Sequence, residues 1–377
     1  MYWRLSTFYL FYFASLGALV PYWSLYLKHL GFTALEIGQL MALLMTTKII
    51  SPNIWGWIAD HTGRPMAVVR LGSLLALVAF SLVFFVHDYW PLALVMVGYS
   101  FFWHAALPQF ESTTLGHLGK EHHRYSQIRL WGSIGFIVSV ASLGPLMDIA
   151  GPGWLPPVLL TLFGAIWLSS LGVPESRRHQ EEEPGAGSLF ELLSKPEVIA
   201  LLAVCFLAQA SHGPYYTFYT LYLEAHGYSH STIGQMWALG VIAEIGIFMV
   251  MHRLAPQFGL RALLIIALLL TTVRWLMIGY WPDSLTLLLS AQTLHAASFG
   301  IFHAVAIALF HRHFRGRHHG RGQALYSSLA FGGGGAFGAL YSGMGWESLG
   351  PAITFAIAAL LAFFAAVIAW RWIEVGR

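Results

Sequence analysis

The chain has 377 residues, of which 57% are hydrophobic and only 10% are charged, and its formal net charge is +3. A soluble protein of this length carries far more charge on its surface, so the composition excludes the ordinary soluble classes and indicates an integral membrane protein. The single cysteine, Cys205, excludes an intramolecular disulfide framework and a cysteine-based zinc site.

Apolar segments long enough for a helix to cross a bilayer follow one another along the chain. The first set falls near residues 5–27, 37–59, 67–86, 91–115, 127–147 and 154–173. The second set falls near residues 197–223, 233–251, 262–281, 285–309, 323–344 and 350–371. The pattern therefore predicts two six-helix halves, 1–173 and 197–377, joined by a polar cytoplasmic linker over 174–196.

The distribution of lysine and arginine predicts the orientation of these spans. One side holds only Lys28. The other side holds Arg4, Arg64, Arg70, Lys120, Arg124, Arg177, Arg178, Lys195, Arg253, Arg261, Arg312, Arg315, Arg317, Arg321, Arg371 and Arg377. We therefore expect a multi-pass protein of the bacterial inner (cytoplasmic) membrane with both termini in the cytoplasm.

An internal repeat supports the division into halves. Leu25-Tyr26-Leu27 and Ile37-Gly38-Gln39 recur 196 residues later as Leu221-Tyr222-Leu223 and Ile233-Gly234-Gln235. The same offset relates Gly31 to Gly227 and Gln127 to Gln323. One constant offset over several segments predicts two parallel repeats of one fold.

The loop after the second span reads Gly56-Trp57-Ile58-Ala59-Asp60-His61-Thr62-Gly63-Arg64-Pro65. It resembles the signature cytoplasmic loop of the major facilitator superfamily. The resemblance implies an all-α membrane fold of twelve transmembrane helices in two pseudo-symmetric halves, which transports by alternating access. Glycines permit a tight turn and the two charges can bond to helix ends, so we expect Gly56, Asp60, Gly63 and Arg64 to form a conformational latch.

Ionisable residues inside the spans are the candidates for the functional site, because burying charge in lipid is costly. They are Lys48, Glu111, Arg129, Glu244 and Arg274, with His104, His212, His295 and His303. Lys48 and Glu244 are 196 residues apart and so occupy equivalent positions of opposite charge. The alternative is that each charge packs helices together or reaches toward the interface.

Glu111 and Arg129, with Tyr125 to Gly135 around the arginine, resemble the fourth-to-fifth-helix region of lactose permease and its relatives. That resemblance implies a glutamate–arginine pair that engages substrate. It also places Glu244, Arg274 and His295 at the family's substrate and proton-coupling positions. The chain departs from the family at Ser298 and Gln292, where the relatives carry a glutamate and a lysine.

The bacterial 3-phenylpropionic acid transporter family offers a fuller resemblance. It rests on Arg129-Leu130-Trp131-Gly132-Ser133, Tyr215-Tyr216, Ala238 to Glu244, Val273-Arg274-Trp275 and Gln292-Thr293-Leu294-His295. It implies an aromatic carboxylate such as 3-phenylpropionate as substrate.

The residues are compatible with that substrate, since arginine can hold a carboxylate with two parallel hydrogen bonds. His212, Tyr216 and Tyr219 share one helical face, where they form either an aromatic pocket or a packing stripe. We accordingly expect Arg129, Glu111, Arg274, Lys48, Tyr216, Tyr219 and His212 to bind substrate.

For proton coupling we expect Glu244 or His295, because histidine titrates nearest neutral pH and a carboxylate responds to its surroundings. The leading hypothesis is a proton-driven symporter that needs no cofactor or metal and functions as a monomer. Its partners would be a small-molecule substrate, protons and membrane lipid, without nucleic acid. The alternatives are a proton-coupled sugar or nucleoside symporter and a non-transporting membrane sensor. An enzyme is not expected, because no nucleophile and base converge.

The segment from His311 to Arg321 holds four histidines and four arginines in irregular spacing. We interpret it as a basic loop facing anionic lipid, and not as a metal site.

Overall fold

The computed structural model describes residues 1–119, 121, 124–176, 189–314 and 319–374. Within those ranges the chain is helical, and eleven helices are long and apolar enough to cross a membrane. The remaining predicted span, near 323–344, is covered by α14 (His319–Tyr326), the π-helix η6 (Ser327–Gly334) and α15 (Gly335–Ser348) in succession. Residues 177–188 of the predicted linker, with Lys120, Arg315, Arg317 and Arg377, lie outside the described residues. The predicted all-α membrane fold is confirmed.

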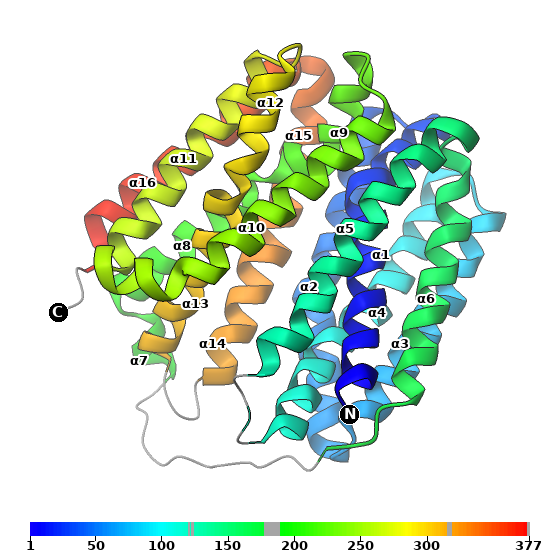
Figure 1. Cartoon of the computed structure of the whole chain (residues 1–377), viewed down its shortest axis with the longest axis vertical. Coiled ribbons are helices and arrows are strands. Elements are labelled where there is room, and N and C mark those ends of the chain that lie inside the picture. Colours follow the sequence, from blue (N-terminus) through cyan, green and yellow to red (C-terminus); the bar gives the residue numbers. More distant parts are fainter. Residues whose placement is uncertain (120, 122–123, 177–188, 315–318, 375–377) are drawn as a thin grey trace. The chain divides into compact units, whose positions relative to one another are not determined.

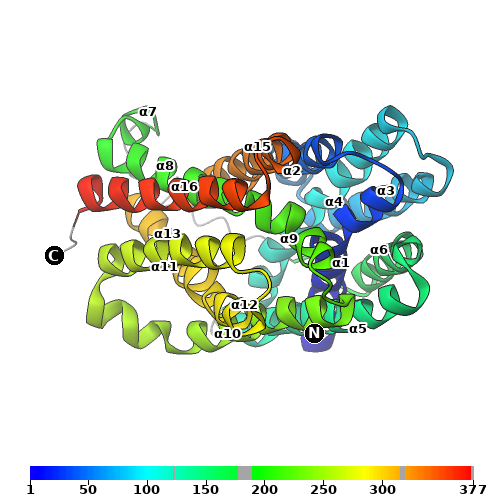
Figure 2. The same cartoon turned by 90° about the horizontal axis from the view of Figure 1, so that it is seen from above.

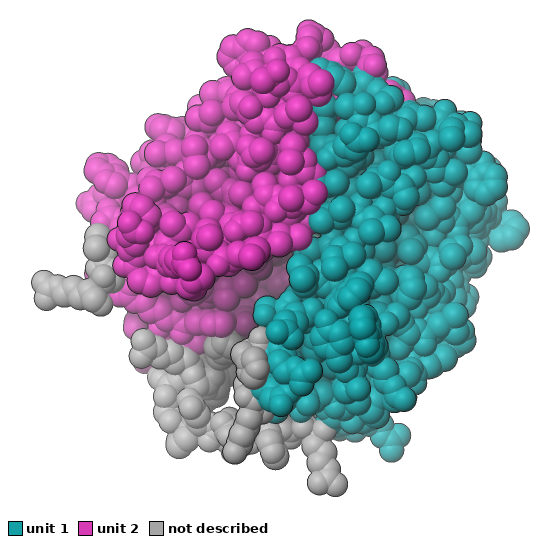
Figure 3. Space-filling view, in the orientation of Figure 1, with its two compact units in different colours: residues 1–180, 228–238 teal, residues 181–227, 239–377 magenta. Residues whose placement is uncertain are grey.

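Two compact units make up the chain (Figure 3). Unit 1 comprises residues 1–180 and 228–238, and unit 2 comprises residues 181–227 and 239–377. Helix α10 (His230–Phe258) therefore contributes its first turns to unit 1 and the rest of its length to unit 2.

Unit 1 consists of long helices with short connections. They are α1 (Tyr2–His29), α2 (Ala34–Thr62), α3 (Pro65–Ser81), α4 (Tyr89–Leu118), α5 (Tyr125–Ala150) and α6 (Leu155–Leu171), with short 3-10 turns at η1 (Leu82–Phe85) and η3 (Pro152–Trp154). Helix α1 packs along α5 and α6, and α4 packs on α2 and α3 (Figure 1). Gly17 permits the α1–α5 approach, because a Cβ there would lie only 2.8 Å from the backbone oxygen of Phe136.

Unit 2 repeats this plan with more interruptions. Besides α10, it contains α7 (Leu189–Leu193), α8 (Pro196–Ser211), α9 (Gly213–Ala225), α11 (Leu260–Tyr280), α12 (Leu285–Thr293), the π-helix η4 (Ala296–Ile301), α13 (Phe302–His313), α14, η6, α15 and α16 (Pro351–Trp372). Helix α16 runs beside α11 and α8 (Figure 2). At the junction of α8 and α9, a Cβ on Gly338 would lie 3.0 Å from Gly213 Cα, so two glycines again allow close helix packing.

The helix boundaries reproduce the sequence repeat. Both ends of α10 lie 196 residues after the corresponding ends of α2. Glycines with positive φ follow equivalent helices: φ is 92° at Gly31 and 81° at Gly227, and 65° at Gly63 and 78° at Gly259. L-residues rarely adopt this conformation, which explains why glycine occupies these turns in both repeats.

The Asp148 side chain caps the start of α10 within unit 1. The Asp148 carboxylate, near the end of α5, accepts hydrogen bonds from the backbone N–H groups of His230 and Ser231 at 2.8 and 2.9 Å. It also bonds His230 Nδ1 at 3.0 Å and the Ser231 hydroxyl. The carboxylate thus caps the N-terminus of a helix 82 residues away, where the helix dipole favours negative charge.

Candidate functional site

Arg129 occupies the second turn of α5 in unit 1, and aromatic rings hold its guanidinium. The carbon Cζ lies 3.7 Å from the centre of the Phe13 ring and 5.7 Å from the centre of the Tyr9 ring, both on α1. Gly132, one turn further along α5, leaves the necessary space. A Cβ on Gly132 would lie 2.6 Å from Arg129 Nη1 and 2.8 Å from Phe13 Cδ2.

The N–H groups of this guanidinium make no hydrogen bond to a described residue. Arg129 is partly exposed, and it makes no hydrogen bond or ion pair with any residue that the structure describes. Glu111 on α4 lies within electrostatic range of Arg129, but its carboxylate instead accepts a 3.4 Å hydrogen bond from the Tyr125 hydroxyl. Glu111 and Arg129 therefore lie near each other but form no direct ion pair.

Lys48 on α2 belongs to the same group, since it also lies within electrostatic range of Glu111. Beside it, Thr47 Oγ1 bonds His104 Nδ1 at 3.1 Å and Ser100 Oγ at 2.9 Å. His104 thereby has a structural partner in a buried α2–α4 contact. Unit 1 thus gathers two cations and one carboxylate from three helices.

Arg274 on α11 has very different surroundings in unit 2. It is fully buried, and four hydrogen bonds hold it in place. Its Nε donates to the Ala291 backbone oxygen at 3.0 Å, and Nη1 bonds Ser298 Oγ at 2.8 Å and His295 Nδ1 at 3.1 Å. Nη2 donates to Gln292 Oε1 at 3.3 Å.

Aromatic rings complete the Arg274 environment. Its Cζ lies 4.2 Å from the centre of the Tyr215 ring and 4.6 Å from the Trp275 ring. The Tyr215 hydroxyl donates to Gln292 Oε1 at 2.9 Å, and Gln292 Nε2 donates to the Tyr219 hydroxyl at 2.6 Å. Gln292 and Ser298, the two departures from the lactose permease pattern, are therefore both direct hydrogen-bond partners of the arginine or its neighbours.

Glu244 joins this network through His295. The His295 Nε2 atom lies 3.5 Å from Glu244 Oε2, while its Nδ1 faces Arg274. Gly300 permits close packing on α10, because a Cβ there would lie only 2.5 Å from Ile247 Cγ2. The π-helix η4 starts directly after His295, and π-turns within helices recur at functional sites. Carboxylate, imidazole and guanidinium thus form one connected series.

His212 marks the break between α8 and α9. Its Nδ1 lies 2.8 Å from the Ala208 backbone oxygen, and its ring stacks on Tyr216 and meets Trp275 edge-on. The Nε2 atom is buried and has no hydrogen-bond partner among the described residues. Of the three residues predicted on one face, Tyr219 reaches the Arg274 network through Gln292, whereas His212 and Tyr216 pack together beside it.

The residues of the loop motif lie where α2 ends and α3 begins. Gly63 is the left-handed C-cap of α2, Arg64 is the N-cap residue of α3, and Asp60 is exposed on the last turns of α2. A Cβ on Gly56 would touch Gln109 of α4 at 3.4 Å. The Glu175 carboxylate caps α3, accepting from the backbone N–H groups of Met66 and Ala67 at 3.0 Å each.

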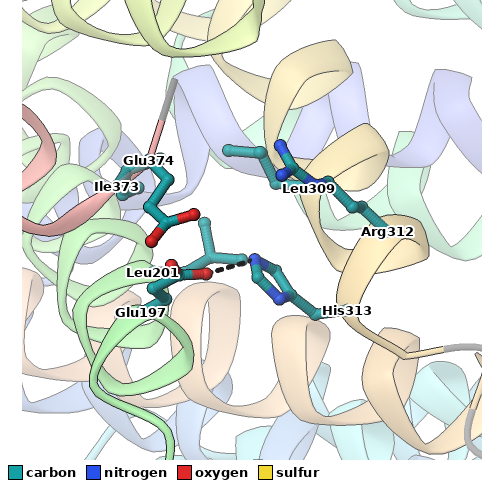
Figure 4. A pocket seen from close by; sticks show the side chains of 7 residues that line it. All are labelled: Glu197, Leu201, Leu309, Arg312, His313, Ile373 and Glu374. Atoms are coloured by element: carbon teal, nitrogen blue, oxygen red, sulfur yellow. Dashed lines mark ion pairs between the residues drawn. The ribbon is translucent and has the colours of Figure 1, made fainter. Parts of the chain in front are cut away.

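A small pocket in unit 2 lies at the start of α8 and the ends of α13 and α16 (Figure 4). Glu197, His313 and Glu374 point into it, and His313 Nε2 lies 3.8 Å from Glu197 Oε2. Among the described residues, no group of three or more histidine, cysteine or acidic side chains is arranged to hold a metal ion.

Sequence reasoning did not identify Phe13 and Gly132, the residues that support Arg129. No motif or repeat distinguishes Phe13 from the other aromatic residues of α1, and the contact is visible only once α1 and α5 are paired. Gly132 lies within the segment that carries both family resemblances, which is the one signal in the sequence that points to it.

Repeated membrane-length helices that carry charged networks within each unit are the architecture of a secondary transporter. The chain belongs to the MFS_1 like family, whose model matches residues 2–357. It is 30% identical over 365 residues to the probable 3-phenylpropionic acid transporter of Escherichia coli (strain K12), with 94% of each chain covered.

Two further comparisons agree with this family. The maltose permease of Geobacillus stearothermophilus is 28% identical over 353 residues, covering 90% of this chain and 87% of the permease. A crystal structure of a variant of the nucleoside transporter NupG superposes with a TM-score of 0.85, covering 100% of both chains at 16% identity. The similar proteins are thus named as transporters, and the major facilitator fold is confirmed.

Proposed function

We propose that this protein takes up a small aromatic monocarboxylate, such as 3-phenylpropionate, together with protons. The observation that carries the substrate class is the geometry of Arg129. One face of its guanidinium lies on Phe13, and its N–H edge has no partner among the described residues. Such an edge matches the two oxygens of a carboxylate, which accept two parallel hydrogen bonds.

The charges in the membrane-embedded networks support an anionic substrate. Unit 1 combines Lys48 and Arg129 with one carboxylate, Glu111, while unit 2 combines Arg274 with one carboxylate, Glu244. Because uncompensated charge is costly in a bilayer, the excess of one positive charge favours a substrate that brings one negative charge. A neutral sugar would leave this excess in place.

Aromatic side chains around the unit 1 charges suit the apolar part of the same substrate. Tyr9, Phe13 and Tyr125 lie beside Arg129 and Glu111, and aromatic pairs gain energy beyond their buried area. The name of the E. coli relative, a probable 3-phenylpropionic acid transporter, supports this assignment.

For coupling we assign the proton to the Glu244–His295 pair. The imidazole lies between a carboxylate and a guanidinium, so a proton gained by the pair changes the bonding of Arg274 directly. Arg274 itself is fully buried, with neutral acceptors on three of its nitrogens. We therefore place Arg274 in the coupling network and Arg129 at the substrate.

The remaining parts of the proposal follow from the sequence pattern. The bias of lysine and arginine supports a location in the bacterial inner membrane with both termini in the cytoplasm. We propose that the chain works as a monomer without a metal or organic cofactor, that the proton gradient supplies the energy, and that the substrate is released chemically unchanged.

The test is uptake of labelled 3-phenylpropionate into proteoliposomes, with and without an inward proton gradient. We expect accumulation that the gradient stimulates. Arg129→Ala should abolish uptake while leaving membrane insertion intact, whereas the control Arg124→Ala should retain it, because Arg124 pairs with Glu121 at an exposed position. Glu244→Gln should retain exchange of substrate across the membrane but lose the stimulation by the gradient.

Competition by unlabelled sugars and nucleosides separates the second candidate function, a sugar or nucleoside symporter. That candidate is favoured by the Glu111 carboxylate beside tyrosine hydroxyls, an arrangement that also suits sugar hydroxyl groups. Uptake of a neutral sugar or nucleoside, without uptake of 3-phenylpropionate, would refute the carboxylate assignment.

A further inference from the structure

A positioning device for Arg129 is visible in unit 1. Phe13 of α1 lies under the guanidinium, with 3.7 Å between Arg129 Cζ and the ring centre. Gly132 lies beside both groups, and a Cβ at that position would come within 2.6 Å of Arg129 Nη1. We propose that Phe13 and Gly132 together set the orientation of Arg129 and so determine the affinity for an anionic substrate.

The inference rests on the proposed function for the identity of the substrate, but its geometry stands independently. A long arginine side chain loses rotamer freedom when it is fixed. The Phe13 ring offsets part of that loss by a cation–π contact, which is attractive over the face of an aromatic ring. The contact requires glycine at position 132, because a Cβ there would lie too close to both the Arg129 guanidinium and the Phe13 ring.

The choice of an aromatic ring has a chemical consequence. A carboxylate or amide partner would hold an arginine through its N–H groups and so occupy the donors that a substrate needs. A ring holds the cation through its face and leaves the donors in the plane available. Arg274 illustrates the opposite arrangement, since Ala291, His295, Ser298 and Gln292 accept from its nitrogens.

Two measurements test the proposal. The first is the rate at which phenylglyoxal modifies Arg129, followed by mass spectrometry of the peptide; it requires no knowledge of the substrate. Phe13→Leu uncovers one face of the guanidinium, so we expect modification to accelerate at least about three-fold. Phe13→Tyr keeps the ring and should react like the parent protein. The second measurement is the KM and maximal rate of 3-phenylpropionate uptake.

For uptake, we expect Phe13→Leu to raise KM about three- to thirty-fold, with the maximal rate within about two-fold of the parent value, as the loss of one cation–π contact predicts. Gly132→Ala should give the same change by displacing the guanidinium, whose end is flexible enough to shift without unfolding α5. The aromatic control is Phe8→Leu, since Phe8 stacks on Phe110 instead of a cation. The glycine control is Gly164→Ala, because a Cβ at that position would have no neighbouring atom within 4 Å.

The outcomes separate this proposal from the proposed function. Unchanged modification of Arg129 in Phe13→Leu would overturn the positioning role whatever the protein transports. An equal fall in the maximal rate of Phe13→Leu and Phe8→Leu, with KM unchanged, would overturn it as well. Faster modification in Phe13→Leu, in a parent protein that does not take up 3-phenylpropionate, would support the positioning role and refute the substrate assignment.

Discussion

Replacing Gln292 by leucine removes the amide that connects Arg274 to two tyrosines. The side chain is fully buried. Its Oε1 accepts from the Tyr215 hydroxyl at 2.9 Å and from Arg274 Nη2 at 3.3 Å, and its Nε2 donates to the Tyr219 hydroxyl at 2.6 Å. Leucine has a similar size but cannot accept or donate, so all three bonds are lost and a cavity is not created.

The structure sets the magnitude of this loss. Side-chain hydrogen bonds between membrane helices average about 0.6 kcal/mol each, so three bonds contribute about 2 kcal/mol. Removing the Gln292 acceptor of a buried guanidinium nitrogen adds about 1–3 kcal/mol. The free energy of unfolding should therefore fall by about 3–5 kcal/mol, which for a unit of this size lowers Tm by on the order of 10 °C.

Thermal unfolding of the purified protein in detergent, followed by tryptophan fluorescence, measures the shift. Gln292→Glu should unfold within a few degrees of the parent protein, because a carboxylate still accepts from Arg274 and from both hydroxyls. The matched control is Gln209→Leu, since Gln209 is buried in the same unit and its side chain has no hydrogen-bond partner among the described residues. Equal Tm values for Gln292→Leu and Gln209→Leu would refute the network.

Three further predictions concern stability, and the first two use the same thermal assay. Asp148→Ala removes the side chain that caps α10, and the free energy of unfolding should fall by about 1–2 kcal/mol; no loss would mean that water replaces the cap at His230 without cost. Gly63→Ala forces a side chain into a φ of 65°, with an expected loss of about 1–2 kcal/mol, whereas Gly98→Ala, whose Cβ would meet only Ala79 at 3.9 Å, should change little. Gly17→Val should sharply reduce the yield of monodisperse protein in size-exclusion chromatography, because its side chain would overlap the backbone of α5; a normal profile would contradict the close α1–α5 packing.

Hydropathy and the repeat predicted the fold well, because the requirement for membrane-length helices leaves few alternatives. The 196-residue offset of the short motifs extends to both ends of α2 and α10 and to the positive-φ glycines Gly63 and Gly259. The breaks and π-turns within the helices of unit 2 were not predictable from the sequence. The π-helix after His295 contains Ser298, whose hydroxyl accepts a hydrogen bond from Arg274 on another helix, and no residue type specifies such a turn.

The candidate residues were predictable, but their surroundings were not. Buried charge is conspicuous in an apolar sequence, so Arg129 and Arg274 appear alike when they are judged by burial cost alone. Their difference comes from partners on other helices: Phe13 for one arginine, and Gln292 and Ser298 for the other. The Asp148 cap was invisible for the same reason, since its partners are 82 residues away.

The unequal charges of unit 1 have an electrical consequence for the transport cycle. Among the described residues, Lys48 and Arg129 face one carboxylate, Glu111, so on the proposed function the site carries one positive charge when empty and none when a monocarboxylate is bound. Moving one charge through the membrane potential changes the energy by about 2.3 kcal/mol per 100 mV. On the proposed function, the proton gained by the Glu244–His295 pair travels with the substrate and restores one positive charge to the loaded carrier. An inside-negative potential would therefore draw the loaded carrier toward the cytoplasm and oppose the return of the unloaded carrier to the same extent, so a cycle that carries one monocarboxylate with one proton moves no net charge.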